Sequence, residues 1–411
     1  MKISLWLQTM NVNQIRKQFP WIKNNKDKIY FDNAATTLKP KCVIDKISYY
    51  YTHLGINIHN TDSTFCFDVY KKIEMARKTI AKIINCPPEN ICFVSGATEG
   101  LTMIAHGLAH YCKKAEVLLN DFEHASNLLP WYHEKQKGFF KIKFINIDEQ
   151  FDKKTIIESI TKNTKIIALT LASNVYGNSI DDYSKLCAQI KKINKKIIIV
   201  LDATQYLAHR WINQLQDIDF VVCSAHKIFG PLGVGFVYFK KDWITKMQPL
   251  RYGGGMNETI TKTKFQPYNN IQKFEGGTMP LAEIIGWQEA IKFIDNIGIK
   301  NIIDYEYKLK KYFVKKMSTI KNLEIYNPNT PLPIIIFNYK GVNAQDFASW
   351  LGTKGIICRS GLSCAKLIKN VLKKENFVRC SLSLYNTKKE IDYLYKVIKR
   401  YKKGEEIRKI L

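Results

Sequence analysis

Lys227 stands four residues after the end of a short apolar run that is rich in β-branched residues and lacks helical periodicity. The run, Phe220–Cys223, is typical of a buried strand. An ammonium group there is costly unless it is paired or neutral, and a lysine of lowered pKa can form a Schiff base with an aldehyde. The alternative is an ordinary surface lysine on a loop. A second predicted strand, Lys196–Thr204, favours the chemical interpretation because it ends in Asp202 and Gln205.

Other polar residues also stand where predicted strands end. His124 follows the strand at 117–119, and Asn174 follows the apolar run at 166–172. Apolar strands that alternate with helices imply a mostly parallel α/β sheet, in which ligands bind at the carboxyl ends of the strands. The residues at such ends are Thr98, His124, Asn174, Asp202, Gln205, Ser224, His226 and Lys227.

A turn of small residues, Ser95–Gly100, links the strand at 91–94 to a helix from about Leu101. Backbone N–H groups and the helix dipole can hold a phosphate at such a turn. A plain helix cap that uses Thr98 explains the same pattern. The turn lacks the lysine of a P-loop and the glycine spacing of a dinucleotide-binding site, so it indicates neither.

A second, smaller domain is predicted in the C-terminal part of the chain. Residues 242–280 are rich in loops, and the helix Leu281–Ile297 leads away from them. The loop Arg359–Cys364 and the strand at 378–385 follow later. We therefore predict a large domain of residues 30–280 and a small domain formed by residues 1–29 and 281–411.

The composition limits the classes of function. The chain has 411 residues, of which 46% are hydrophobic, so it can fill a sizeable core. Its formal net charge is +27, with lysines scattered along the chain and dense only at Lys396–Lys409. This scatter favours general basicity over a nucleic-acid-binding stripe, and an acidic protein partner fits it as well. No apolar run is long enough to span a membrane.

The ten cysteines contain no CxxC pair and no zinc spacing. They predict reduced thiols in a cytoplasmic protein and no metal site. His106 and His110 have the spacing of helical metal ligands, but no third ligand accompanies them. The start, MKISLWLQTM, has a short apolar patch without a signal-peptide cleavage site, and Met10 is an alternative start.

The strand-end residues match the needs of pyridoxal phosphate (PLP). This cofactor requires a lysine for its aldehyde, an acid for its pyridinium nitrogen, a phosphate cradle and a flat group against the ring. Lys227 is the candidate lysine, Asp202 the candidate acid, and Gln205 can donate to the ring hydroxyl. His124 can stack on the ring. The candidate phosphate ligands are Ala97, Thr98, Ser224 and His226.

Taken together, these stretches resemble the aminotransferase class V group of PLP enzymes, and within it the group II (SUF-type) cysteine desulfurases. The resemblance covers nearly the whole chain, and the Arg359–Cys364 loop with Arg379 narrows it to the desulfurase branch. The stretches are YFDNAATT (30–37), VSGATEGL (94–101), NDFEHASN (120–127), SNVYGN (173–178), LDATQ (201–205), SAHKIFGPLGVG (224–235), FEGGT (274–278), RSGLSCA (359–365) and VRCSLSLYNT (378–387).

The resemblance implies a PLP-dependent transferase of fold type I, with a small α+β C-terminal domain. It implies that L-cysteine is converted to L-alanine and that its sulfur stays on Cys364 as a persulfide for iron–sulfur cluster assembly. It also implies a homodimer and a scaffold or other sulfur-acceptor protein as partner. The implied roles are substrate binding by Arg379, Arg359 and Asn174, proton transfer by Lys227 and His124, and contact of Thr278 with the partner subunit's cofactor phosphate.

Two positions depart from the pattern of this branch. A histidine usually precedes the catalytic cysteine, whereas here Ser363 does, after Leu362. Ser63 likewise stands where the branch often has a histidine. Around Cys364, the nearby Arg359 and a helix expected to begin just after the cysteine would favour the thiolate.

Three alternatives remain at the level of sequence. A selenocysteine lyase uses the same cofactor and a similar cysteine. Another class V PLP enzyme, such as a kynureninase-like hydrolase, needs no loop thiol. The third alternative is a basic scaffold or nucleic-acid-binding protein without enzymatic activity. The presence of Lys227 and Asp202 argues against it, because such a protein needs neither residue.

Overall fold

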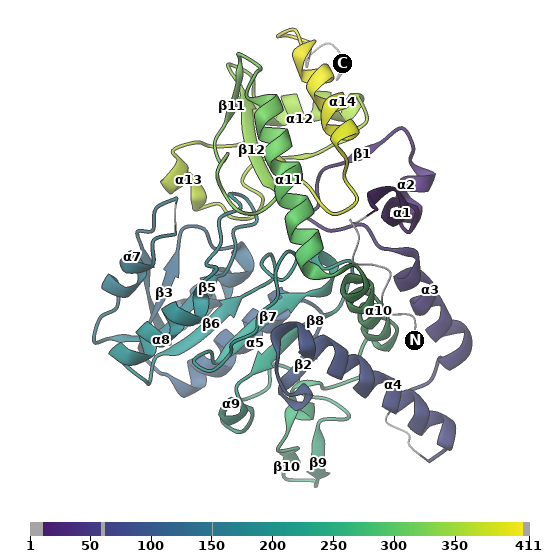
Figure 1. Ribbon diagram of the computed structural model, residues 1–411. Coiled ribbons are helices and arrows are strands. Elements are labelled where there is room, and N and C mark those ends of the chain that lie inside the picture. The colour runs from purple at the N-terminus through teal and green to yellow at the C-terminus, as the bar shows by residue number, and fades with distance from the viewer. Residues whose placement is uncertain (1–10, 59–61, 150, 406–411) are drawn as a thin grey trace.

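The structure is a computed structural model that describes residues 11–58, 62–149 and 151–405 (Figure 1). The N-terminal apolar patch with Met10 and the end of the basic tail lie outside the described residues. Within the described part of the chain, no helix is long and apolar enough to cross a bilayer.

A seven-stranded sheet organises the larger part of the molecule. All its neighbouring strands are parallel except for one strand, which runs antiparallel to both its neighbours. The mostly parallel sheet predicted from the sequence is thus confirmed. Most of its strands are buried on both faces, as parallel sheets require, whereas the edge strand Phe140–Ile145 is only partly buried. The order across the sheet is β2 (Ile91–Val94), the antiparallel β8 (Gly235–Phe239), β7 (Phe220–Ser224), β6 (Ile198–Asp202), β5 (Thr164–Thr170), β3 (Ala115–Asn120) and β4 (Phe140–Ile145).

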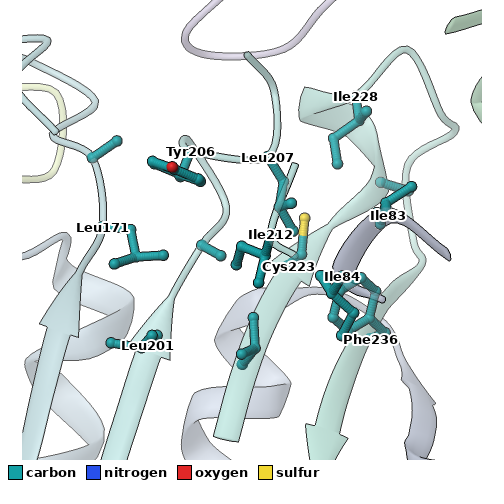
Figure 2. Close-up of a cluster of buried hydrophobic side chains, with 14 of the residues drawn as sticks. Ile83, Ile84, Leu171, Leu201, Tyr206, Leu207, Ile212, Cys223, Ile228 and Phe236 are labelled. Atoms are coloured by element: carbon teal, nitrogen blue, oxygen red, sulfur yellow. The ribbon is translucent and has the colours of Figure 1, made fainter. Parts of the chain in front are cut away.

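Helices cover both faces of this sheet because its side chains alternate between two apolar cores. Figure 2 shows part of one core, where Cys223 and Phe236 of neighbouring strands lie beside Ile84, and Leu201 of the next strand belongs to the same cluster. The helices that contribute to this core include α4 (Thr64–Ala81), α7 (Lys153–Glu158), α8 (Tyr183–Ile193) and α10 (Leu281–Ile297). The opposite core contains α5 (Ala97–Tyr111), α6 (Leu129–Gln136) and α9 (Lys241–Lys246).

A four-stranded antiparallel sheet forms the centre of the small domain, at the top of Figure 1. Its order is β11 (Leu323–Ile325), β12 (Ile334–Tyr339), β15 (Val378–Ser381) and β14 (Arg359–Ser360). A third apolar core joins it to α11 (Ile299–Met317), α12 (Ala344–Thr353) and α14 (Lys388–Lys399). Beside it, β1 (Ile29–Tyr30) pairs in parallel with β13 (Ile356–Ile357).

Helix α10 packs with the large domain, whereas the sequence placed it in the small one. A Cβ on Gly286 would lie 2.7 Å from Ile47 of α3 (Lys41–Tyr49), so the two helices touch closely. Ile284 and Ile291 share their core with Val43 of α3. The helix is apolar around much of its circumference, and such a pattern does not tell which layer it joins. The helices that pack on the four-stranded sheet are α11, α12 and α14.

A hairpin of β9 (Asn257–Ile260) and β10 (Phe265–Pro267) lies within the stretch predicted to be loop-rich. The remaining helices are α1 (Val12–Lys17), α2 (Pro20–Asn24) and α13 (Ile368–Leu372). Short helical turns are η1 (Tyr50–Leu54), η2 (Lys82–Ile84), η3 (Pro88–Asn90), η4 (Ala125–Asn127), η5 (Ala225–Lys227) and η6 (Ile271–Phe274).

Gly235 lets β8 pass close to the turn before α5. A Cβ at this position would lie 2.5 Å from the carbonyl oxygen of Cys223 and 2.8 Å from the Cα of Gly96, and neither backbone atom can rotate away. We expect Gly235→Ala to lower the free energy of unfolding by about 1–3 kcal/mol in denaturant titrations. Gly352→Ala in α12 is the control, because its Cβ would meet no heavy atom within 4 Å. Equal stability of both variants would contradict the expectation.

Candidate active site

A cavity of about 220 Å³ lies at the carboxyl ends of β5, β6 and β7. The last residue of each strand, Thr170, Asp202 and Ser224, lines it, and residues of the small domain close its other side. All but one of the residues proposed from the sequence meet here. They are Ala97, Thr98, His124, Asn174, Asp202, Gln205, Ser224, His226, Lys227, Arg359, Cys364 and Arg379.

Lys227 ends the short turn η5 directly after β7. Its Nζ donates hydrogen bonds to the carbonyl oxygens of Ala34 and Ala35 in the loop after β1. Burial, together with the positive charge of Arg379, lowers the pKa of Lys227 to about 7, although nearby carboxylates oppose the shift. A substantial fraction of this amine is therefore neutral, and nucleophilic, near neutral pH.

Asp202 and Gln205 border the cavity where β6 ends. The Asp202 carboxylate accepts a hydrogen bond from the backbone N–H of Thr204 at 3.0 Å. The hydroxyl of Thr204 and the side-chain oxygen of Gln205 are buried and have no partner within the chain. Buried polar atoms without partners are rare, so this wall of the cavity fits a polar ligand.

The N-terminus of α5 forms another wall. Gly96 is the N-cap residue and provides no side-chain cap, so the predicted alternative of a Thr98 cap is wrong. Thr98 instead bonds Ser126 through its hydroxyl at 2.7 Å, while Ala97 N–H donates to the Ser224 hydroxyl at 2.8 Å. These hydroxyls and the uncapped helix end suit a phosphate.

Two histidines in the cavity wall favour their neutral forms. Burial and the neighbouring Lys227 lower the pKa of His226 to about 3, and its Nδ1 is buried without a partner. Burial also lowers the pKa of His124, whose Nδ1 accepts a hydrogen bond from Ser126 N–H at 3.1 Å. A neutral imidazole at either position can donate to an anion and can accept a proton.

Arg379 is 1% exposed and carries its guanidinium into the cavity from β15. Its Nη1 donates to the Asn174 carbonyl oxygen at 2.7 Å, and its Nη2 donates to Asp32 at 2.6 Å. The Nε–H is buried without a partner. Arg359 stands opposite Arg379 in the β14–β15 register, so two cations lie side by side at this wall. This pair of side chains favours a carboxylate ligand.

Asp32 also belongs to this site, although it was not among the site residues proposed from the sequence. The available signal was an acidic residue directly after a short strand, at the start of a run of small residues. Its pairing with Arg379 joins positions 347 residues apart, so no local pattern reveals it.

Cys364 is exposed at the cavity on a loop with an unusual backbone. Ser363 and Cys364 both have left-handed conformations, with φ of 45° and 65°. The carbonyl oxygen of Cys364 accepts from Ala125 N–H at 2.8 Å, and that of Ser363 accepts from the Asn174 side chain at 2.8 Å. Two hydrogen bonds to strand-end loops of the large domain therefore hold a costly conformation.

The surroundings of Cys364 correct one expectation. Helix α13 begins at Ile368, not just after the cysteine, so its N-terminus is not adjacent to the thiol. Ser363 stands where the group II cysteine desulfurases usually have a histidine. Its side chain is buried, and its hydroxyl has no hydrogen-bond partner. Leu362 packs against the large-domain core.

Thr278 lies apart from this cavity. It lines a separate hollow with residues of α4 and the loop at 254–257. Its predicted contact with a partner subunit's cofactor stays a prediction.

Among the described residues, no cluster of three or more side chains could hold a metal ion. The Nδ1 of His110 contacts the backbone carbonyl of His106, as in an ordinary helix.

Residues 29–394 match the aminotransferase class-V family. The chain therefore belongs to this family, whose members use PLP. A probable cysteine desulfurase of Ureaplasma parvum serovar 3 is 44% identical over 97% of this chain and 100% of its own length. A cysteine desulfurase of Wigglesworthia glossinidia brevipalpis is 34% identical over 95% of this chain and 98% of its own length. The apo cysteine desulfurase of Thermococcus onnurineus NA1 superposes with a TM-score of 0.89 and 29% identity, over 95% of this chain and 98% of that one.

Proposed function

We propose that the chain is a PLP-dependent cysteine desulfurase of the group II type, which converts L-cysteine to L-alanine and holds the sulfur as a persulfide on Cys364. One observation carries the proposal: an exposed thiol stands at the cavity that contains a half-buried lysine of lowered pKa and a buried arginine. Other PLP reactions of this family need no such thiol. The similarity to cysteine desulfurases along nearly the whole chain supports the same conclusion.

The unpartnered atoms in the cavity wall fit PLP. Lys227 would bind its aldehyde, Asp202 would hold a proton on its ring nitrogen, and His124 would lie against the ring. When bound, PLP supplies an electron sink for negative charge at the substrate Cα. The phosphate would be held by Ala97, Thr98, Ser224 and His226, with Thr278 contributed by the partner subunit.

The two arginines would orient the substrate. The unpaired Nε–H of Arg379 and the neighbouring Arg359 offer donors to the substrate carboxylate, beside the Asn174 side chain. Asp32 holds the Arg379 guanidinium in place before the substrate arrives. In the substrate complex, the neutral amine of Lys227 takes a proton from Cα, and His124 is the second candidate for proton transfer.

Cys364 performs the sulfur transfer. Its thiolate attacks the substrate sulfur, so that an S–S bond forms while the Cβ–S bond breaks. The electron pair of the broken bond remains with the substrate carbon, which takes up a proton on the way to alanine. The balance is L-cysteine plus enzyme thiol giving L-alanine plus enzyme persulfide. The two anchors of the loop, at Ala125 and Asn174, place the thiol at the cavity.

The partners follow from the same proposal. The enzyme works as a homodimer in the cytoplasm and passes its sulfur to an acceptor, such as a scaffold protein of iron–sulfur cluster assembly. The net charge of +27 favours an acidic face on that acceptor. We propose no nucleic-acid partner, because the lysines are scattered along the sequence rather than gathered in one stripe.

Mass spectrometry of the PLP-loaded protein after incubation with L-cysteine tests this function. We expect one added sulfur on the peptide that contains Cys364, together with L-alanine in solution. A parallel incubation with selenocysteine measures selenide release. Much faster turnover of selenocysteine would assign the chain as a selenocysteine lyase. A protein that binds no PLP, but shifts DNA at physiological salt, would support a nucleic-acid-binding scaffold instead.

The pKa of Lys227 predicts how the apo protein captures PLP. Burial lowers this pKa from 10.5 to about 7, so the reactive neutral amine appears as the pH rises through 7. We expect the rate of PLP capture, followed by visible absorbance after mixing, to rise from pH 6 to 8 and then level off, with a midpoint near 7. A rate that still climbs above about pH 9 would indicate a lysine of ordinary pKa.

A further inference from the structure

Three buried side chains, those of Gln205, His209 and Glu306, form a hydrogen-bonded chain from the cavity to helix α11. Gln205 lines the cavity, and its Nε2 lies 3.2 Å from Nε2 of His209. On the far side of the ring, Nδ1 of His209 lies 2.8 Å from a carboxylate oxygen of Glu306. Their exposed fractions are 5%, 7% and 2%, respectively. Neither His209 nor Glu306 lines the cavity, so they reach a ligand only through Gln205.

The Glu306 carboxylate orders the hydrogen bonds of this chain. A carboxylate only accepts, so Nδ1 of His209 carries the proton. In the neutral ring, Nε2 then has a lone pair and accepts from the Gln205 amide NH₂ group. The Gln205 carbonyl oxygen is thereby turned away from His209, and it is the atom that is buried without a partner.

Glu306 bonds His209 and forms no ion pair with the neighbouring Lys310. The buried Lys310 lies one turn further along α11, where an ion pair with Glu306 would be easy to form. Lys310 donates instead to the backbone carbonyl and the hydroxyl of Thr330. A buried polar pair of this kind is costly to desolvate, which favours a role beyond packing.

We infer that His209 and Glu306 are positioning residues for the cofactor ring, because they hold the Gln205 amide with its carbonyl oxygen toward the cavity. The inference rests on the proposed PLP function. Gln205 then accepts a hydrogen bond from the ring hydroxyl. This differs from the expectation drawn from the sequence, in which Gln205 donates to that group. An acceptor at this place favours the protonated hydroxyl.

Two substitutions of Glu306 separate orientation from simple packing. Glu306→Gln still offers an oxygen to Nδ1–H and should preserve the chain. Glu306→Leu removes the acceptor, so either ring nitrogen of His209 can carry the proton and the Gln205 amide can turn. For Glu306→Leu we expect a shifted visible absorbance band of bound PLP and a PLP dissociation constant raised roughly 3- to 10-fold. Glu306→Gln should resemble the unaltered protein in both.

Lys310→Met is the matched control. Lys310 is also 2% exposed on α11, but it hydrogen-bonds Thr330 rather than His209 or Glu306. It should leave the absorbance band unchanged even if it lowers the unfolding midpoint. Adding Glu306→Leu to Gln205→Leu should cause no further shift, because the effect passes through Gln205. If Glu306→Leu does not fold, His209→Leu combined with Glu306→Leu removes both polar partners and provides the same test.

Three results would overturn the inference. They are an unchanged band in folded Glu306→Leu, equal bands in Glu306→Gln and Glu306→Leu, or the same shift in Lys310→Met. Failure of the proposed function looks different, because the unaltered protein would then bind no PLP or release no alanine from L-cysteine.

Discussion

Replacing Cys364 by serine should leave a protein that binds PLP but forms no persulfide, with turnover of L-cysteine lower by about 10³-fold or more. The reason is that a hydroxyl is a far weaker nucleophile toward sulfur than a thiolate. The residue is exposed on a loop, so the substitution should not change stability measurably. Sulfide and alanine release, with mass spectrometry of the peptide, measure the effect.

Cys112→Ser is the control for this experiment. Cys112 is also partly exposed, but burial raises the pKa of its thiol to about 11, so it is a poor nucleophile near neutral pH. We expect the control to retain full turnover. If Cys364→Ser kept its turnover, the desulfurase proposal would be wrong.

Lys227→Ala should bind PLP without a covalent link and should lose turnover by about 10³-fold or more. Both effects share one cause, because the same amine binds the aldehyde and moves the proton at Cα. Dialysis against buffer without PLP, followed by measurement of the bound cofactor, tests the first effect. A steady-state assay with added PLP tests the second.

Lys310→Met distinguishes the position of Lys227 from the general properties of a buried lysine. Burial lowers the pKa of Lys310 to about 7 as well, but this side chain contacts Thr330 and lies outside the cavity. We expect the variant to keep its PLP through dialysis. Loss of PLP from this variant, with retention by Lys227→Ala, would refute the assignment of the lysine.

The large-domain part of the site was predictable from the sequence because of its topology. In a parallel sheet, strands that are far apart in the chain end at the same edge. Polar residues at strand ends, such as Asp202 and Lys227, could therefore be placed together without knowing any contact. The apolar strand patterns are local, and the strands predicted at 91–94, 117–119, 166–172, 196–204 and 220–223 all lie in one sheet.

The small-domain part of the site followed only from resemblance. Nothing in the local pattern of the Arg359–Cys364 loop shows that it faces the cavity. The structure places it there through contacts with Ala125 and Asn174, which lie far away in the sequence. The left-handed backbone at Ser363 and Cys364 has no sequence signal either, because neither residue is the glycine that this conformation favours.

The sequence by itself determined most strands of the large sheet, the residues at their ends and the cofactor that those residues suit, because strand patterns and strand ends are local properties. It did not predict the edge strand Phe140–Ile145. Only the tertiary structure decided which charges pair, which layer α10 joins and which atoms lack partners. Asp32 with Arg379, and His209 with Glu306, are contacts between residues 347 and 97 positions apart. Such contacts depend on how the two domains pack, and packing is a property of the whole fold rather than of any one segment.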